Sequence, residues 1–146
     1  MAVDRTLDLR PGVIDIADNV DDILAMLTPT VLTASDITFS SKFEQYSTSA
    51  QNRVNITVIA GMVFLSGAVK PTVEIPSTGE HVIATLPASC RPQNQKYFVC
   101  QGSQRNVYTL IVKTNGEITL SRYGTTAYTA CPVGAFIRIE CAYTIY

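Results

Sequence analysis

The single histidine and the glutamates of the second part of the chain are the residues whose chemistry could support catalysis. His81 is the only histidine, so a serine–histidine or cysteine–histidine nucleophile would have to use it. Every aspartate lies within the first 36 residues, so only a glutamate, such as the neighbouring Glu80, could orient His81 for catalysis. A single histidine of this kind is more often on the surface, and we expect His81 to be a solvated surface residue. A glycosidase needs two carboxyl groups close together, whereas the glutamates fall on different predicted elements. These are Glu44, Glu74, Glu80, Glu117 and Glu140.

The cysteines do not have the spacing of a metal site. They are Cys90, Cys100, Cys131 and Cys141. They form no CxxC pair and match no zinc motif. An even number permits two disulfides, but a chain of this size and apolar content does not need them, so we expect buried free thiols. Nucleotide-binding and metalloprotease motifs are absent. We therefore expect no metal, no cofactor and no enzymatic activity.

Two predicted loops, at residues 101–106 and 121–130, carry side chains that suit ligand binding. The candidates are Arg105, Asn106, Arg122, Tyr123 and Tyr128. A tyrosine combines an apolar ring with a hydroxyl, which suits a sugar, and the planar arginine fork suits a phosphate or carboxylate. The alternative, for any one of them, is an ordinary turn residue or a tyrosine packed on a neighbouring protomer.

The pattern of the second part of the chain predicts β-strands that would position these loops. Alternating apolar residues predict one long strand over residues 53–70, with Gly61 and Gly67 as bends or bulges. Further strands are predicted at the positions given next. They are 81–86, 96–102, 106–114 and 117–123. Asn115-Gly116 indicates a hairpin with a type I′ turn.

The last segment and the spacing of the turns complete this prediction. Residues 134–146 alternate over their whole length, which predicts one long closing strand with Ile137, Ile139 and Cys141 facing inward. Short strands separated by turns every 8–12 residues are typical of an antiparallel β-sandwich or barrel. The fold class we expect is therefore mainly β, preceded by a short N-terminal helix.

The helix is predicted before Pro29, because the residue before a proline avoids the helical region. Its apolar residues step by three and four, as in a heptad repeat. They are Val13, Ile16, Val20, Ile23 and Leu27. β-branched residues at both seam positions favour three or more chains. Two heptads are marginal alone in water, so we expect a trimeric neck that acts together with a larger module. The alternative is an amphipathic helix packed on its own domain.

Charge divides the chain in the same place. All seven aspartates precede residue 37, whereas the remainder carries nine Lys or Arg against five Glu. We therefore expect a neck over residues 1–35 and a β head over residues 36–146. The net charge of −1 is too small to predict a nucleic acid partner. No apolar run approaches the length of a membrane span, and the first residues lack a secretory signal; we expect synthesis in a cytoplasm and no membrane insertion.

Four motifs follow one another in the second part of the chain. They are a strand with an internal glycine (ITVIAGMVFLSGAV), a Leu-Pro and Arg-Pro corner (IATLPASCRP), an Asn-Gly hairpin (LIVKTNGEITL) and an aromatic closing strand (CAYTIY). In this order they resemble the C-terminal head of bacteriophage tail-fibre and baseplate receptor-binding proteins, over residues 54–146. The predicted neck looks like the trimeric shoulder that precedes such heads.

The resemblance implies a function and a setting. We expect a homotrimer at the tail tip of a virion, assembled in the host cytoplasm and attached to other tail or baseplate proteins. It would adhere to a host cell-surface ligand, expected to be a saccharide, and three linked sites would gain avidity. The alternatives are a purely structural trimerisation module and, less favoured, a small carbohydrate-active enzyme.

Overall fold

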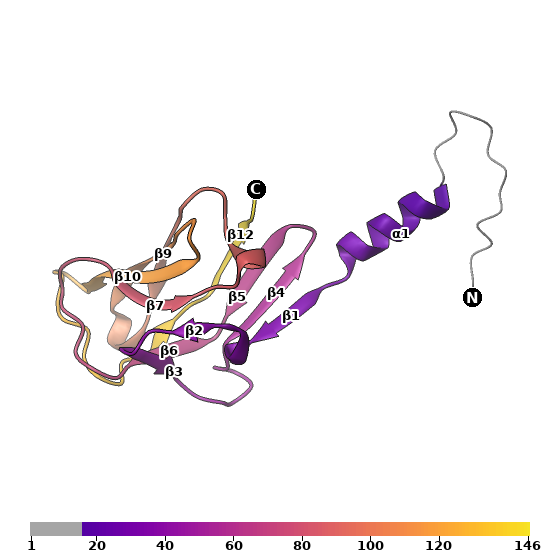
Figure 1. Cartoon of the computed structure of the whole chain (residues 1–146). Helices are drawn as coiled ribbons and strands as arrows, with labels where there is room; N and C mark the ends of the chain where they lie inside the picture. Colours follow the sequence, from indigo (N-terminus) through magenta and orange to yellow (C-terminus); the bar gives the residue numbers. More distant parts are fainter. Residues whose placement is uncertain (1–15) are drawn as a thin grey trace.

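The structure is a computed structural model that describes residues 16–146, with side chains described from residue 20 onward. One α-helix, α1 (Ile16–Leu27), leads into short strands that form three antiparallel sheets (Figure 1). The four-stranded sheet has the order β1 (Thr30–Thr33), β4 (Asn55–Ile59), β5 (Met62–Ser66), β12 (Cys141–Thr144). The five-stranded sheet has the order β2 (Thr38–Phe39), β7 (His81–Thr85), β10 (Glu117–Gly124), β9 (Val107–Val112), β8 (Lys96–Gln101). The three-stranded sheet has the order β11 (Ile137–Arg138), β6 (Ala68–Pro71), β3 (Phe43–Gln45).

One hydrophobic core lies between the sheets, because each sheet turns its alternate apolar side chains inward. Ile56 of the four-stranded sheet, Leu110 of the five-stranded sheet and Ile137 of the three-stranded sheet are all 0% exposed and belong to one cluster. Three single turns of 3-10 helix connect strands, and the only α-helix of the described residues is α1. The prediction of a mainly β, antiparallel sandwich is confirmed.

The prediction of one long strand over residues 53–70 is wrong. A two-residue turn at Ala60-Gly61 divides it into β4 and β5, with Ile59 paired to Met62. Both turn residues have a positive φ, 49° and 75°, which is the type I′ geometry that fits the twist of a hairpin. The bend expected at Gly61 is thus a complete hairpin turn, which the sequence does not indicate because alanine rarely takes this conformation.

The predicted long closing strand is also divided, and the place of the division has a physical reason. Gly67 (φ 110°) separates β5 from β6. Ile139 lies opposite, and its amide donates a 3.0 Å hydrogen bond to the carbonyl of Gly67. The segment through Gly67 and the segment through Ile139 therefore bend together as they pass from the four-stranded into the three-stranded sheet, as strands do at sandwich corners. Ile137 and Ile139 face inward as predicted, whereas Cys141 is only partly buried.

The hairpin predicted at Asn115-Gly116 is confirmed in position but not in turn type. Only Gly116 has a positive φ, of 90°. Its amide bonds to the carbonyl of Lys113 at 2.9 Å, and the amide of Lys113 bonds to the carbonyl of Glu117 at 2.9 Å. This is the three-residue loop in which a turn is followed by a left-handed glycine.

Helix α1 extends away from the sheets (Figure 1). Of the predicted neck residues, Val13 lies outside the described residues and the side chain of Ile16 is not described, whereas Val20, Ile23 and Leu27 are 46–54% exposed. The described apolar side chains of the helix are thus exposed in the single chain, and its last turn is tied to the head by a 2.9 Å hydrogen bond from the amide of Ala60 to the carbonyl of Met26. Strand β1, which falls within the expected neck, pairs with β4 of the head.

Candidate functional site

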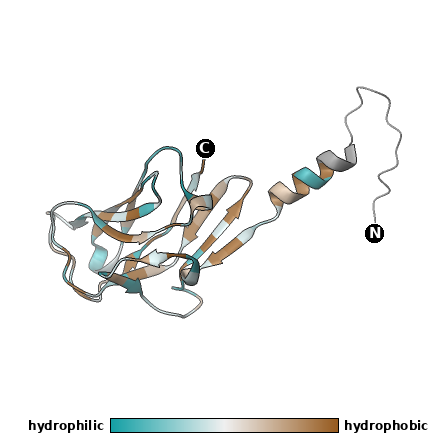
Figure 2. Cartoon of the chain, in the orientation of Figure 1, coloured by the Kyte–Doolittle hydropathy of each residue, from teal (hydrophilic) through white to brown (hydrophobic). Residues whose placement is uncertain are grey.

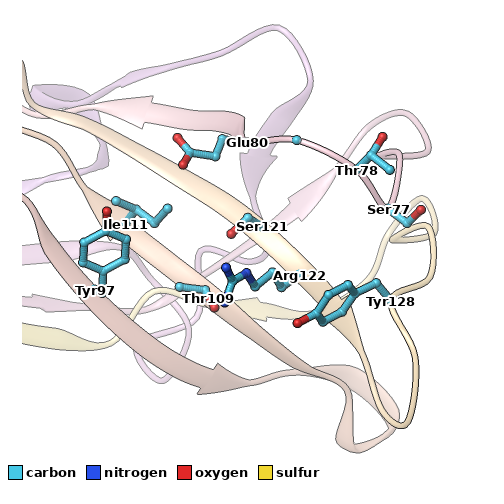
Figure 3. Close-up of a pocket in the computed structure, with 10 residues that line it drawn as sticks. Ser77, Thr78, Glu80, Tyr97, Thr109, Ile111, Ser121, Arg122 and Tyr128 are labelled. Atoms are coloured by element: carbon cyan, nitrogen blue, oxygen red, sulfur yellow. The ribbon is translucent and has the colours of Figure 1, made fainter.

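A groove of about 490 Å³ lies on the outward face of the five-stranded sheet (Figure 3). Its floor is formed where β8, β9 and β10 run side by side. Tyr97 of β8 stands opposite Ile111 of β9, and Thr109 of β9 stands opposite Ser121 of β10. These four side chains line the groove. Because side chains alternate along a strand, the same strands turn Leu110 and Leu120 into the core.

One wall of the groove is the segment before β7, residues 77–80. Two contacts fix it. The Nε2 of His81 bonds to the carbonyl of Thr78 at 2.9 Å, and Glu80 forms a 2.9 Å ion pair with Lys113. His81 therefore holds the wall in place, and its structural contact explains its position at the start of a strand.

Arg122 reaches the groove because β10 contains a bulge. Ser121 pairs with Thr109 and Gly124 pairs with Val107, so Arg122 and Tyr123 together stand opposite a single residue. Arg122 has a φ of 56°, a left-handed conformation that is unfavourable for a residue with a side chain. Bulges of this kind redirect side chains and are frequent beside functional sites. Here the bulge places Arg122 on the outward face next to Ser121.

The guanidinium of Arg122 extends over the groove floor in Figure 3, with Tyr97 toward one end and Tyr128 toward the other. Arg122 is exposed and forms no ion pair with any residue that the structure describes. Arg138, by contrast, is held by Glu140 at 2.9 Å. The hydrogen-bond donors of Arg122 are therefore available to a ligand.

Tyr123 does not take the surface position that the sequence analysis assigned to it. The bulge turns its side chain inward, where it is 4% exposed and stacks on Tyr108 with ring centroids 6.2 Å apart. Burial raises the pKa of its hydroxyl, which accepts a 3.0 Å hydrogen bond from the side-chain amide of Asn106. Tyr123 and Asn106 support the groove from below and do not line it.

Arg105 lies at the tip of the β8–β9 hairpin, outside the residues that line the groove. Gln104 and Arg105 both have positive φ, 53° and 63°, and the turn is closed by a 3.0 Å hydrogen bond from the amide of Asn106 to the carbonyl of Ser103. Of the five candidates, the structure therefore brings Arg122 and Tyr128 together in the groove. Whether either of them binds a ligand stays a prediction.

A second depression of about 290 Å³ adjoins the groove. Thr109, Arg122 and Tyr128 line both depressions, so Arg122 and Tyr128 lie on the ridge between them. Val99 of β8 lines the second one and is 77% exposed, and Tyr97 in the first is 65% exposed. Neither residue was among the predicted candidates, although the alternation of β8 separates the exposed Tyr97 and Val99 from the inward-facing Phe98.

The glutamates are less scattered than expected. Glu80 and Glu117 contact the same ammonium group of Lys113, at 2.9 and 3.7 Å. The hydrogen bond that the ammonium of Lys113 donates to the carboxylate of Glu80 is the main reason that the pKa of Lys113 is raised, so the lysine stays charged between the two carboxylates. Within the described residues, no group of three His, Cys, Asp or Glu side chains is placed to hold a metal ion, and no helix is long and apolar enough to cross a membrane.

Comparisons with known proteins give one informative result. No protein-family model matches the chain, and no curated protein matches it. Among solved structures, the chain is similar to the receptor-binding protein (gp15) of Listeria phage PSA, with 17% sequence identity and a TM-score of 0.53 over 86% of this chain and 73% of that one. The two proteins share a fold.

Proposed function

We propose that this chain is a receptor-binding head of a tailed phage or a related particle, and that it adheres to a saccharide on the host surface. The observation that carries the proposal is the groove in which two exposed tyrosines, Tyr97 and Tyr128, flank the unpaired guanidinium of Arg122. The fold shared with a phage receptor-binding protein supports the same function.

The groove has the groups that a sugar requires. The rings of Tyr97 and Tyr128 offer apolar surface to the C–H faces of a sugar ring, and their hydroxyls remain at the water boundary. Arg122 donates several hydrogen bonds in a fixed plane, and Ser121 and Thr109 add hydroxyls at the floor. A groove of this kind binds through stacking and hydrogen bonds, without turnover of the ligand.

The assembly that we propose is a homotrimer at the tail tip of the virion, formed in the host cytoplasm and attached to other tail or baseplate proteins. A shallow saccharide site is weak on its own. Three linked sites raise the apparent affinity by two to four orders of magnitude, as an order-of-magnitude expectation, when their spacing allows simultaneous binding.

The test is a binding experiment with the full chain on a glycan array and on fixed bacterial cells of a host panel. Arg122→Ala, Tyr97→Ala and Tyr128→Ala are each expected to lower binding at least about tenfold, equivalent to about 1.4 kcal/mol. Arg53→Ala, which removes an exposed arginine elsewhere, is the matched control and should bind like the unmodified chain.

Two outcomes would contradict the proposal. A chain that binds no glycan and no cell in the panel would indicate a purely structural module. Release of reducing ends from a bound polysaccharide would indicate an enzyme instead, and the carboxylates of Glu80 and Glu117 would then be the first residues to substitute.

A further inference from the structure

The outward face of the four-stranded sheet lacks charge. Its strands have the sequences TVLT, NITVI, MVFLS and CAYT, none of which contains Asp, Glu, Lys or Arg. The strand registers place Val31, Thr57, Phe64 and Ala142 in one row across this face. A solvated sheet face normally alternates apolar inward with polar and charged outward residues, so this face differs from the expected pattern.

The apolar members of this row are exposed in the single chain. Val31 is 62% exposed and Phe64 is 44% exposed, whereas Leu32 and Leu65, their chain neighbours, turn toward the core. Figure 2 shows that brown, apolar positions alternate with paler ones along the strands of this sheet, as inward and outward residues do. Thr57 lies between Val31 and Phe64 in the row, so the face is uncharged and partly apolar. Exposed apolar side chains on one face are a feature of interaction sites, and loss of charged residues marks the centre of a protein–protein interface.

Helix α1 continues directly into this sheet, because only two residues separate Leu27 from β1. The described apolar residues of the helix, Val20, Ile23, Leu24 and Leu27, are 46–57% exposed. A helix of 12 residues is marginal in water without packing, and within the described residues its last turn is bonded to the head, through the carbonyl of Met26. The helix therefore needs partner chains, and a heptad seam makes copies of itself the suitable partners.

We infer that the outward face of the four-stranded sheet is covered by a second copy of this chain, and that this face and α1 together form the subunit interface of the trimer. The inference rests on the homotrimer of the proposed function and assigns a face to it. A second copy is the occupant because the face offers no charge to attract a charged partner, and because the adjoining helix brings copies of the same face together.

The assignment gives the two outward faces of the head different roles. The groove with Arg122 lies on the five-stranded sheet, whereas the uncharged row centred on Phe64 lies on the four-stranded sheet. The groove and Phe64 lie on different sheets, so a contact that covers Phe64 does not itself require Arg122 to be covered.

The test is the mass of the full chain measured by light scattering after size exclusion. Phe64→Lys places a charge at the centre of the row. The side chain at this position is half exposed in the single chain, so the head should tolerate the charge, whereas a covered face should not. The variant is expected to lower the mass from three chains to one. Val133→Lys is the matched control: Val133 is 61% exposed and lies in the loop before β11, so this variant should keep the mass of the unmodified chain. Circular dichroism and thermal unfolding establish that both variants fold.

Each result decides the inference. A monomeric Phe64→Lys variant that retains the β spectrum, beside a trimeric control, supports the assigned face. An unmodified chain that is monomeric at high concentration, or a folded Phe64→Lys variant that keeps the full mass, overturns it. The proposed function fails separately, by absence of glycan or cell binding, and a trimer that depends on Phe64 but binds nothing would retain the inference while removing that function.

Discussion

The side-chain amide of Asn106 donates a 3.0 Å hydrogen bond to the hydroxyl of Tyr123, and this bond joins two strained places in the five-stranded sheet. Asn106 closes the turn in which Gln104 and Arg105 have positive φ, and Tyr123 directly follows Arg122, which also has positive φ. Strained conformations of this kind persist only where the surroundings fix them. The position of Arg122 in the groove therefore depends on a buried contact made by its neighbour.

Replacing Tyr123 by phenylalanine removes this contact while leaving the ring on Tyr108. We expect Tyr123→Phe to lower the free energy of unfolding by about 1 kcal/mol, the usual net value of one hydrogen bond, and to weaken glycan binding through a less ordered Arg122. Urea unfolding and a binding isotherm measure the two effects. Tyr46→Phe, on a different sheet edge, is the control; an unchanged isotherm for Tyr123→Phe would show that the contact does not position Arg122.

Arg122→Gly separates backbone strain from binding. Glycine takes a positive φ without steric penalty, whereas an L-residue pays about 1–2 kcal/mol. After the greater chain entropy of glycine is subtracted, we expect Arg122→Gly to be about 0.5–1 kcal/mol more stable than Arg122→Ala. Both variants lose the guanidinium and should lose glycan binding equally. Thermal unfolding of the pair measures the difference, and a glycine variant less stable than the alanine variant would contradict the strain assigned to this bulge.

Gly124 is a position where any side chain should disrupt the bulge. Its φ is 155°, and an added Cβ would collide with the carbonyl of Ala127. We expect Gly124→Ala to lower the free energy of unfolding by about 2–4 kcal/mol, as for other strained or overpacked sites. Gly134→Ala is the comparison variant: its φ of 73° lies near the left-handed region that an L-residue can reach, and nothing lies within 4 Å, so it should cost only about 1–2 kcal/mol. Equal losses would mean that the contact with Ala127 is unimportant.

The thiols of Cys131, which is buried, and Cys141, which is partly buried, should make stability fall at alkaline pH. Burial raises the pKa of Cys131 and of Cys141 to about 12, whereas a thiol of the unfolded chain ionises near pH 8.5, its approximate reference pKa. Between these values the unfolded state releases a proton that the folded state keeps. The contribution of the protonated thiols to the free energy of unfolding is therefore fully present below about pH 8.5. It falls by up to about 1.4 kcal/mol per pH unit for each thiol toward pH 12.

Urea unfolding at pH 8 and pH 10 measures this effect. Cys131→Ala is expected to be less stable than the unmodified chain at pH 8, because a buried group is lost, but to show a smaller decrease between the two pH values. The decrease is compared with that of Val133→Ala, which alters an exposed residue. A Cys131→Ala variant with the same decrease as this control would show that the thiol does not carry the pH dependence.

The strands that follow simple alternation were predictable from the sequence. β7, β8, β9 and β10 lie where the period of two and the turn residues placed them, and Gly116 marks the predicted hairpin. Period-two burial is a local signal, because each strand turns one side chain in two toward the core. For the same reason the fold class could be predicted without knowing which strands pair.

The divided strands and the groove could not be predicted, because they depend on single backbone conformations. Alanine at position 60 gives no sign of a turn, and the bend at Gly67 depends on its pairing with a distant segment. The bulge at Arg122 shifts the alternation of β10 by one residue, and such a shift moves a side chain from one face to the other. This explains why Tyr123 was expected at the surface and lies in the core, while Arg122 lies in the groove.

The groove combines a floor of paired strands with walls that lie outside them, at residues 77–80 and at Tyr128, and residues 125–128 line the adjoining depression. Substitutions in these walls leave the hydrogen-bonded ladder of β8, β9 and β10 intact. A change at the rim therefore reshapes the groove without altering the ladder, whereas a change at Tyr97 or Arg122 alters both the groove and a strand.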